Sequence, residues 1–247
     1  MNKLVEALKT CGSPQPMGFK SARETAARPR LLLIASTDAA DSQLAENTKG
    51  ANALLVTSEL KETQIKGVAK AAAEIPWGCA LANQPEDRLA SVIQAGADFV
   101  TFTQDTPLKT LPERETERVL EISTDAAEKL PRAVNDSQAD VVYLITAQGS
   151  EPLTWRHLLL IRALSAWLSK PLLVSVPDTA SESELQALWD AGAAGVVASA
   201  LPGNIARLRK AVDGLKYPAK HKTEERTPVI PSVGFSTAEP DEEDEDW

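Results

Sequence analysis

Between about residue 30 and residue 216 the sequence repeats one alternation, in which a short aliphatic run is followed by a longer polar segment with helical spacing. Short, continuous apolar runs are typical of strands that are buried on both faces. The runs are RLLLIAS (30–36), NALLVTS (52–58), IPWGCAL (75–81), DFVTFT (98–103), RVLEIST (118–124), DVVYLIT (140–146), PLLVSV (171–176) and GVVASA (195–200). Strand, helix and strand in repeated order predict parallel βαβ units and therefore an α/β fold.

Eight such units predict a single (β/α)₈ TIM barrel over residues 30–217, and a chain of 247 residues has the length for one. An internal repeat supports this prediction. LASVIQAGADFV, from Leu89, matches LQALWDAGAAGV, from Leu185, in the order of helix, Ala-Gly-Ala and strand. RLLLIASTD (30–38) likewise matches RVLEISTD (118–125), so strands one and four correspond to strands five and eight, as in two half-barrels.

The segment QDTPLKTLPERETE (104–117) is the weak point of the barrel prediction, because its two prolines leave room for only a short helix. An open, doubly wound parallel sheet is therefore the alternative fold.

Two further regions flank the predicted barrel. Residues 1–29 contain a short amphipathic helix, with its apolar stripe at Leu4, Val5 and Leu8, and an arm that leads to the first strand. Residues 218–247 contain prolines, show no periodicity and end in the acidic run DEEDEDW, which predicts a disordered tail. Within this tail the apolar segment TPVIPSVGF (227–235) and the acidic run that follows it, together residues 227–247, form a candidate docking peptide for a protein partner.

Composition excludes several classes of function. A net charge of −9 argues against general nucleic-acid binding, which needs a basic surface. No apolar run approaches the roughly 20 residues of a membrane span. Cys11 and Cys79 are too few for a disulfide framework and have no metal-ligand pattern around them, so we interpret them as small packing residues. With no export signal, the expected location is the cytoplasm.

The stretch AGAAGVVASA (191–200) resembles the eighth strand of the phosphate-binding, aldolase-type barrels, among them flavin-dependent nitronate-type oxygenases, thiamine-phosphate synthases and histidine-biosynthesis isomerases. In those families, backbone N–H groups after strands seven and eight hold a phosphate near a helix N-terminus. Here Ser199, Gly203 and Asn204 follow strand eight as possible donors, and no Lys or Arg is expected to lie near them.

The other half of that phosphate site is absent, because Pro177 lacks an N–H group and Asp178 would repel a phosphate. Closure of the barrel alone is therefore the alternative role for the AGAAGVVASA stretch. The cofactor stays unknown, and a phosphate-bearing cofactor such as FMN is disfavoured.

Polar side chains gather at the predicted carboxyl ends of the strands, where barrel active sites lie. Those interpreted as ligand-binding are Ser36, Thr37, Asn83, Thr103, Ser123, Thr124, Gln148, Asp178, Ser199, Gly203 and Asn204. The strand ends carry no His, Lys, Arg or Cys, which disfavours Schiff-base chemistry and anionic substrates. We therefore expect a polar ligand that is not strongly anionic.

Asp38 and Asp125 are the candidate catalytic residues, since each follows a Ser-Thr pair at the end of strand one or strand five. These strands face each other across a barrel, and the histidine-biosynthesis isomerases that the sequence resembles use aspartates after the same two strands as general acid and base. The alternative is that both aspartates cap the following helices. A divalent cation held by these residues with Asp105 and Asp178 has no spacing motif to support it, so no metal site is predicted.

Two classes of function follow from these observations. In the first, the barrel binds a small molecule and acts as a lyase- or isomerase-type enzyme through its paired aspartates. In the second, the barrel is a non-catalytic scaffold that recruits a protein through its acidic tail. Barrel folds are usually enzymatic, which favours the first class by analogy of fold, whereas the scarcity of reactive side chains at the strand ends favours the scaffold. The ligand-binding barrel is the preferred interpretation, and the scaffold is the alternative.

Overall fold

The computed structural model describes residues 3–11, 29–38, 43–84, 86–112, 116–129, 131–146 and 151–216. Its strands are β1 (Leu32–Thr37), β2 (Ala53–Val56), β3 (Trp77–Ala80), β4 (Phe99–Thr103), β5 (Glu117–Ser123), β6 (Val141–Ile145), β7 (Leu172–Ser175) and β8 (Gly195–Ser199). Its α-helices are α1 (Lys3–Thr10), α2 (Leu44–Asn47), α3 (Glu62–Ala71), α4 (Glu86–Gln94), α5 (Thr124–Lys129), α6 (Pro131–Asp136), α7 (Trp155–Trp167), α8 (Glu182–Ala191) and α9 (Asn204–Gly214). Two 3₁₀ helices, η1 (Leu81–Asn83) and η2 (Leu108–Thr110), complete the elements of the described residues.

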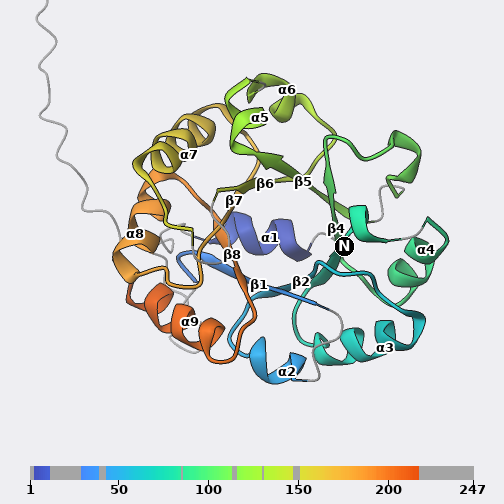
Figure 1. The fold of residues 1–247 in the computed structure, drawn as a ribbon. Helices are drawn as coiled ribbons and strands as arrows, with labels where there is room; N and C mark the ends of the chain where they lie inside the picture. Colours follow the sequence, from blue (N-terminus) through green and yellow to red (C-terminus); the bar gives the residue numbers. More distant parts are fainter. Residues whose placement is uncertain are drawn as a thin grey trace, which may run out of the picture. The chain divides into compact units, whose positions relative to one another are not determined.

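The strands form a closed parallel barrel in sequence order, with helices around it (Figure 1). β1 closes the ring by pairing with β2 on one side and β8 on the other, where Leu32 lies opposite Gly195. The predicted (β/α)₈ fold is therefore confirmed, and the open-sheet alternative is wrong. Each predicted strand lies within two residues of its observed bounds, because continuous apolar runs identify strands that are covered on both faces.

Alternating strand residues divide the core into two parts. Side chains such as Leu54, Val100 and Leu144 point outward and pack beneath the helices. Side chains such as Ile34, Leu55 and Phe99 point inward and fill the barrel itself. This inner cluster occupies the end of the barrel where the strands begin, so the barrel is a packed core there and not a channel.

Glycines in the segment from residue 192 to residue 203 act in packing and helix ends. Gly192, with φ of 107°, ends α8, and a Cβ there would meet Ser165 Cβ at 2.5 Å. Gly195 begins β8, where a Cβ would lie 2.9 Å from the backbone oxygen of Leu32 across the closing strand pair. Only a residue without a side chain fits there, which supports barrel closure as the role of this part of the AGAAGVVASA stretch.

Helix α1 lies across the end of the barrel where the strands begin, and Figure 1 shows it within the ring of strands. Leu4, Val5 and Leu8 are buried in the inner cluster. At the start of β5, Glu117 accepts hydrogen bonds from the backbone N–H groups of Leu4 (3.0 Å) and Val5 (3.1 Å). The predicted amphipathic helix is thus part of the barrel's core, since its apolar stripe matches the open floor of the barrel.

Between β4 and β5 the described residues contain only η2, as expected from the prolines of this segment. Leu108 in η2 is 88% exposed.

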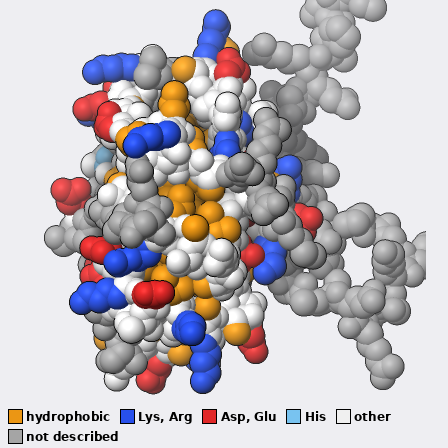
Figure 2. Space-filling view, turned by 90° about the vertical axis from the view of Figure 1, so that its right-hand side faces the viewer, with side chains coloured by type: hydrophobic (Ala, Val, Ile, Leu, Met, Phe, Trp, Pro, Cys, Tyr) orange, Lys and Arg blue, Asp and Glu red, His pale blue; other side chains and the backbone are white. Residues whose placement is uncertain are grey.

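The face that carries α3 and α4 in Figure 1 is turned toward the viewer in Figure 2, where basic and acidic side chains flank a band of hydrophobic ones. Among the described residues, no helix is long and apolar enough to cross a membrane. The predicted tail, residues 218–247, lies outside the described residues.

Candidate functional site

The end of the barrel where the strands finish contains a cavity of about 390 Å³. Its lining is Ser36, Leu55, Thr57, Ala80, Ala82, Glu121, Tyr143, Ile145, Ser175, Val176, Val197, Ala198 and Ser199. These residues come from seven strands, all but β4, or from the positions just after them, and most belong to the inward-facing rows. The cavity therefore begins where the inner apolar cluster ends, and hydroxyl groups and one carboxyl group surround it.

Glu121 provides the one acidic side chain among the described residues of this lining. It stands in the middle of β5, between apolar neighbours, and its register partner on β6 is Tyr143. The hydroxyl of Thr101 on β4 donates a 2.5 Å hydrogen bond to Glu121 Oε1. Burial raises the pKa of the Glu121 carboxyl, because removal from water disfavours its charge, and the Thr101 hydrogen bond offsets only part of this effect.

Tyr143 lies beside Glu121 with its side chain 7% exposed. Burial, and secondarily the nearby Glu121 charge, raise the pKa of the Tyr143 phenol, so it stays protonated. On β7, the Ser175 hydroxyl accepts a hydrogen bond from Thr146 N at 2.8 Å, which orients it at the wall of the cavity. The site thus offers a neutral phenol, several hydroxyls and a carboxyl group that gains a proton more readily than usual.

The raised pKa of Glu121 predicts how the stability of the folded protein depends on pH. The folded protein holds the Glu121 proton more tightly than the unfolded chain, so its stability falls as pH rises from the ordinary value of 4.5 through the folded pKa. Glu121→Gln removes this loss. We expect the variant to melt above the wild type at neutral pH and at nearly the same temperature near pH 4, measured by thermal denaturation across pH. Glu117, whose pKa is also raised, is present in both proteins and cancels in the difference. A lower melting temperature for Glu121→Gln at pH 7 would contradict the assignment.

Asp38 lies at the rim of this cavity. It follows β1, its side chain is exposed, and its Oδ1 accepts a hydrogen bond of 3.4 Å from Thr57 Oγ1. It lines a neighbouring hollow of about 580 Å³, which shares Ser36, Thr57 and Ser199 with the cavity around Glu121. Thr37, which is 8% exposed, lines the same hollow. Asp38 therefore stands at the mouth of the barrel, and its role there stays a prediction.

Asp125 occupies a different environment. It stands in the first turn of α5, with its side chain 76% exposed, and Oδ1 lies 3.6 Å from Arg156 Nη2 at the start of α7. Arg156 also pairs with Glu128 at 2.9 Å. Asp125 lines neither of the two mouth hollows. The structure thus does not bring the two predicted catalytic aspartates together around one cavity, and their catalytic role stays a prediction.

The residues after β7 and β8 form a closed hydrogen-bond network. Asn204 Nδ2 donates to Asp178 Oδ1 (3.3 Å) and to the Ser199 carbonyl (2.9 Å), and Gly203 precedes α9 with φ of 74°. Arg207 donates to the Ala180 carbonyl, at 2.6 Å, and to Asn204 Oδ1, at 3.1 Å. The expectation that no basic residue lies near strand eight is wrong, because one turn of α9 brings Arg207 back. Its guanidinium is engaged with the protein's own oxygens.

Thr103, Ser123 and Thr124 are not among the residues that line the cavity around Glu121. Thr103 N donates to Thr106 Oγ1 within the turn after β4, and Ser123 Oγ accepts from Ala126 N at the start of α5. Thr124 is the first residue of α5. Asn83 belongs to η1, but its side chain is not among those described, and Gln148 lies outside the described residues.

Glu121, Tyr143 and Ser175 are the site residues that the sequence reasoning missed. The signal was an acid and a phenol inside RVLEIST and DVVYLIT, at positions where strands buried on both faces otherwise carry apolar residues. A polar residue within such a run must face either the helices or the barrel interior, and both are expensive unless it has a role.

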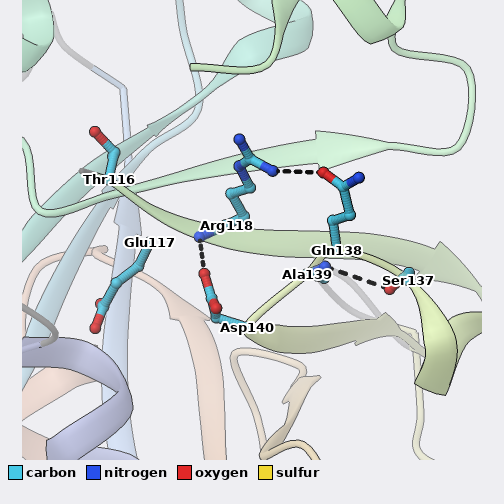
Figure 3. A pocket seen from close by; sticks show the side chains of 7 residues that line it. All are labelled: Thr116, Glu117, Arg118, Ser137, Gln138, Ala139 and Asp140. Carbon is cyan, nitrogen blue, oxygen red and sulfur yellow. Dashed lines mark hydrogen bonds between the residues drawn. The ribbon is translucent and has the colours of Figure 1, made fainter. Parts of the chain in front are cut away.

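A second cavity, also of about 390 Å³, lies at the opposite end of the barrel, where β5 and β6 begin (Figure 3). There Arg118 donates from its guanidinium to Gln138 Oε1 and from its backbone to Asp140 Oδ2, both at 2.9 Å. Glu117 points away from these residues, toward α1. The side chains of this cavity hold the floor of the barrel together, so we interpret it as structural.

The described part of the chain was compared with the requirements of a metal site and of a reactive thiol. There, no three His, Cys, Asp or Glu side chains gather as a metal site would require. Cys79 is buried in β3, and burial raises the pKa of its thiol to about 12, which keeps it protonated and unreactive.

Comparisons with known proteins identify the fold. No family model and no curated protein matches the chain. Among solved structures, the tryptophan synthase alpha-subunit of Pyrococcus furiosus is 15% identical, covers 75% of this chain and 97% of its own, and has a TM-score of 0.59. A single-residue mutant of that same subunit is 16% identical, with 74% and 97% covered and a TM-score of 0.57.

Thiamine phosphate pyrophosphorylase from Pyrococcus furiosus is 14% identical, with 75% of this chain and 96% of that chain covered and a TM-score of 0.55. At such identities the likeness concerns the fold. The barrel fold that the resemblance implied is confirmed at that level.

Proposed function

We propose that the cavity around Glu121 binds a small polar molecule without strong negative charge, and that Glu121 exchanges a proton with it in a lyase- or isomerase-type reaction. The observation that carries this proposal is the position of the carboxyl group. It lies inside the barrel at the end where the strands finish, lines a cavity of a size suited to a small molecule, and has a raised pKa.

A raised carboxyl pKa favours proton exchange with a ligand, because Glu121 then gains and loses its proton at a higher pH than an ordinary carboxyl group does. The Thr101 hydroxyl, which donates to Glu121 Oε1, stabilises the carboxylate after the proton has left. Tyr143, kept neutral, is placed to donate a hydrogen bond to a ligand oxygen next to Glu121. Ser36, Ser175 and Ser199 supply further polar contacts around the cavity.

The class of ligand follows from the charges of the lining. Neither mouth hollow has a Lys, Arg or His among its described lining residues, so a phosphate or carboxylate group would meet no opposite charge there. Both structural neighbours described above are enzymes by name, which fits an enzymatic role for this barrel. A neutral polyol, amide or carbonyl compound agrees best with the hydroxyls and the single carboxyl group.

Native mass spectrometry of the purified protein, compared with its denatured mass, tests this proposal. We expect a bound small molecule that Glu121→Gln weakens by roughly 10- to 100-fold, the effect of losing one hydrogen bond to a charged group. Asp125→Asn is the matched control, because it removes an equally charged but exposed side chain outside the cavity, and it should leave binding unchanged.

If no ligand is carried through purification, thermal shift with neutral polyols, amides and hydroxyketones replaces the mass measurement. Their phosphorylated counterparts serve as the comparison, and they should shift the melting temperature less. Equal binding by the wild type and Glu121→Gln would overturn the role of Glu121. Loss of binding in Asp38→Asn and Asp125→Asn alone would instead support the paired aspartates.

A further inference from the structure

The outer face of α7 carries a diagonal row of apolar side chains. Trp155, Leu159 and Trp167 have exposed fractions of 80%, 68% and 57%. Ala163, also exposed, stands between the last two. With a spacing of four residues these side chains form one continuous ridge on the helix surface, which we call the α7 ridge.

The inner face of α7 is apolar as well. Leu160, Ile161 and Leu164 are buried against the barrel wall. The polar residues of α7 are Arg156, His157, Arg162 and Ser165. A helix with large apolar side chains on two opposite faces is typical of one that is covered on both sides. The described residues cover only the inner side, and large exposed apolar side chains that gather in one place usually mark an interaction surface.

We propose that a second copy of this chain covers the α7 ridge, with α7 packed antiparallel against the partner's α7 across a two-fold axis. The ridge is self-complementary about its middle. Trp155 and Trp167 lie equally far from that middle, and so do Leu159 and Ala163. Across the axis Trp155 therefore meets the partner's Trp167, and Leu159 meets the partner's Ala163, whose small side chain leaves it room. Two aligned ridges of this spacing give the commonest class of helix packing, with axes crossing at about −50°.

Charges at the two ends of α7 favour the antiparallel arrangement. At its start lie Asp125 and Glu128, which both pair with Arg156. At its end Arg132 of α6 stacks over the Trp167 ring, 5.3 Å from the ring centre. An antiparallel pair places the acidic end of each copy beside the basic end of the other, whereas a parallel pair would put like charges together.

The two tryptophans of the ridge supply less than half of the area that a stable dimer buries on each copy. At their exposed fractions, the two tryptophans supply roughly 200–350 Å² per copy, given about 150–250 Å² for a buried aromatic side chain. A stable interface buries about 800 Å² per partner. Leu159, Ala163 and the charged residues of α5 and α6 therefore have to supply the rest. Tryptophans within the contact and charges at its edge are the usual arrangement of such interfaces.

Sedimentation velocity of the full chain over a range of concentrations tests this proposal. We expect the wild type to reach twice the chain mass of 26.5 kDa. Leu159→Glu would bury a charge close to the two-fold axis and raise the dimer dissociation constant at least about tenfold, with an unchanged circular dichroism spectrum. Leu108→Glu is the matched control, since Leu108 is 88% exposed but lies in η2, and it should leave the dimer intact.

A charge exchange tests the orientation. Arg132→Glu should weaken the dimer, and Arg132→Glu combined with Glu128→Arg should restore it, since each copy then offers the opposite charge at both ends. Failure of the double variant to recover association would overturn the antiparallel pairing. A wild type that stays monomeric at every concentration would overturn the dimer. A Leu108→Glu variant that dissociates as readily as Leu159→Glu would overturn the α7 ridge as its interface.

Discussion

Replacing Leu4 by alanine is expected to lower the free energy of unfolding of the barrel by about 2–5 kcal/mol, the range for a fully buried leucine. Leu4 precedes the barrel in the sequence, yet its side chain is 0% exposed and lies among the inward-facing residues of the strands. Its loss leaves a cavity at the floor of the barrel, where closed strands prevent the walls from collapsing inward. Urea denaturation followed by fluorescence measures the effect.

Glu6→Ala provides the control for Leu4→Ala, because Glu6 lies on the exposed side of the same helix. This change should alter stability by less than about 0.5 kcal/mol, as is usual for surface positions. A Leu4→Ala protein that unfolds at the wild-type urea concentration would show that α1 does not contribute to the core. Loss of α1 docking without loss of barrel stability would have the same meaning.

Gly78→Ala is expected to lower the free energy of unfolding by about as much as Leu4→Ala, because it overfills the barrel interior and does not leave a cavity there. Gly78 faces the barrel interior from β3, beside Phe99 of β4. A Cβ at Gly78 would lie 2.2 Å from the backbone oxygen of Phe99 and 2.5 Å from its ring. The Phe99 ring could move away only into a filled core, and the Phe99 backbone oxygen is held in place by the strand, so neither clash can be relieved. Overpacking of this kind typically costs about 1–3 kcal/mol, and here the contact with backbone places the expected loss at about 3 kcal/mol or more.

Gly67→Ala is the matched control for Gly78→Ala. Gly67 lies in α3 with nothing within 4 Å of a Cβ, so alanine there should stabilise the protein by roughly 0.5–1 kcal/mol through helix propensity. Thermal and urea denaturation of the two variants should therefore move in opposite directions. Equal stabilities for Gly78→Ala and the wild type would mean that Gly78 does not face Phe99.

The fold was predictable because its signal is repeated and local. Each strand of the barrel is buried on both faces, so each appears as an uninterrupted aliphatic run, and helix ends carry their own chemistry. Ser181, for example, caps α8 by accepting a hydrogen bond from Glu184 N, and Gly192 ends that helix in a left-handed conformation. Such features depend on neighbours within a few residues, so they can be recognised in the sequence without knowledge of tertiary contacts.

The candidate site was less predictable, because its position depends on which way a side chain points. Polar residues at the predicted strand ends include Ser36, Asp38 and Ser199, which do line the mouth of the barrel. Glu121 was not among the predicted residues, because it lies within a strand, two residues before its end. Its burial, its hydrogen bond from Thr101 and its neighbour Tyr143 all come from other strands, so no local pattern reveals them.

The alternation of apolar runs and helices determined a parallel α/β fold with strands covered on both faces, a condition that a closed barrel and an open doubly wound sheet both meet. Closure of the barrel, through the pairing of β1 with β8, was decided by the tertiary structure. How deeply each side chain is buried in the barrel could be determined only from the tertiary structure. Strand register brings Glu121 beside Tyr143, docking places Leu4 in the barrel floor, and the turn into α5 carries Asp125 out to Arg156. The periodicity of the sequence predicts which residues share a face. The free energy of ionising a buried side chain instead depends on all atoms within a few ångströms, and these atoms come from distant parts of the sequence.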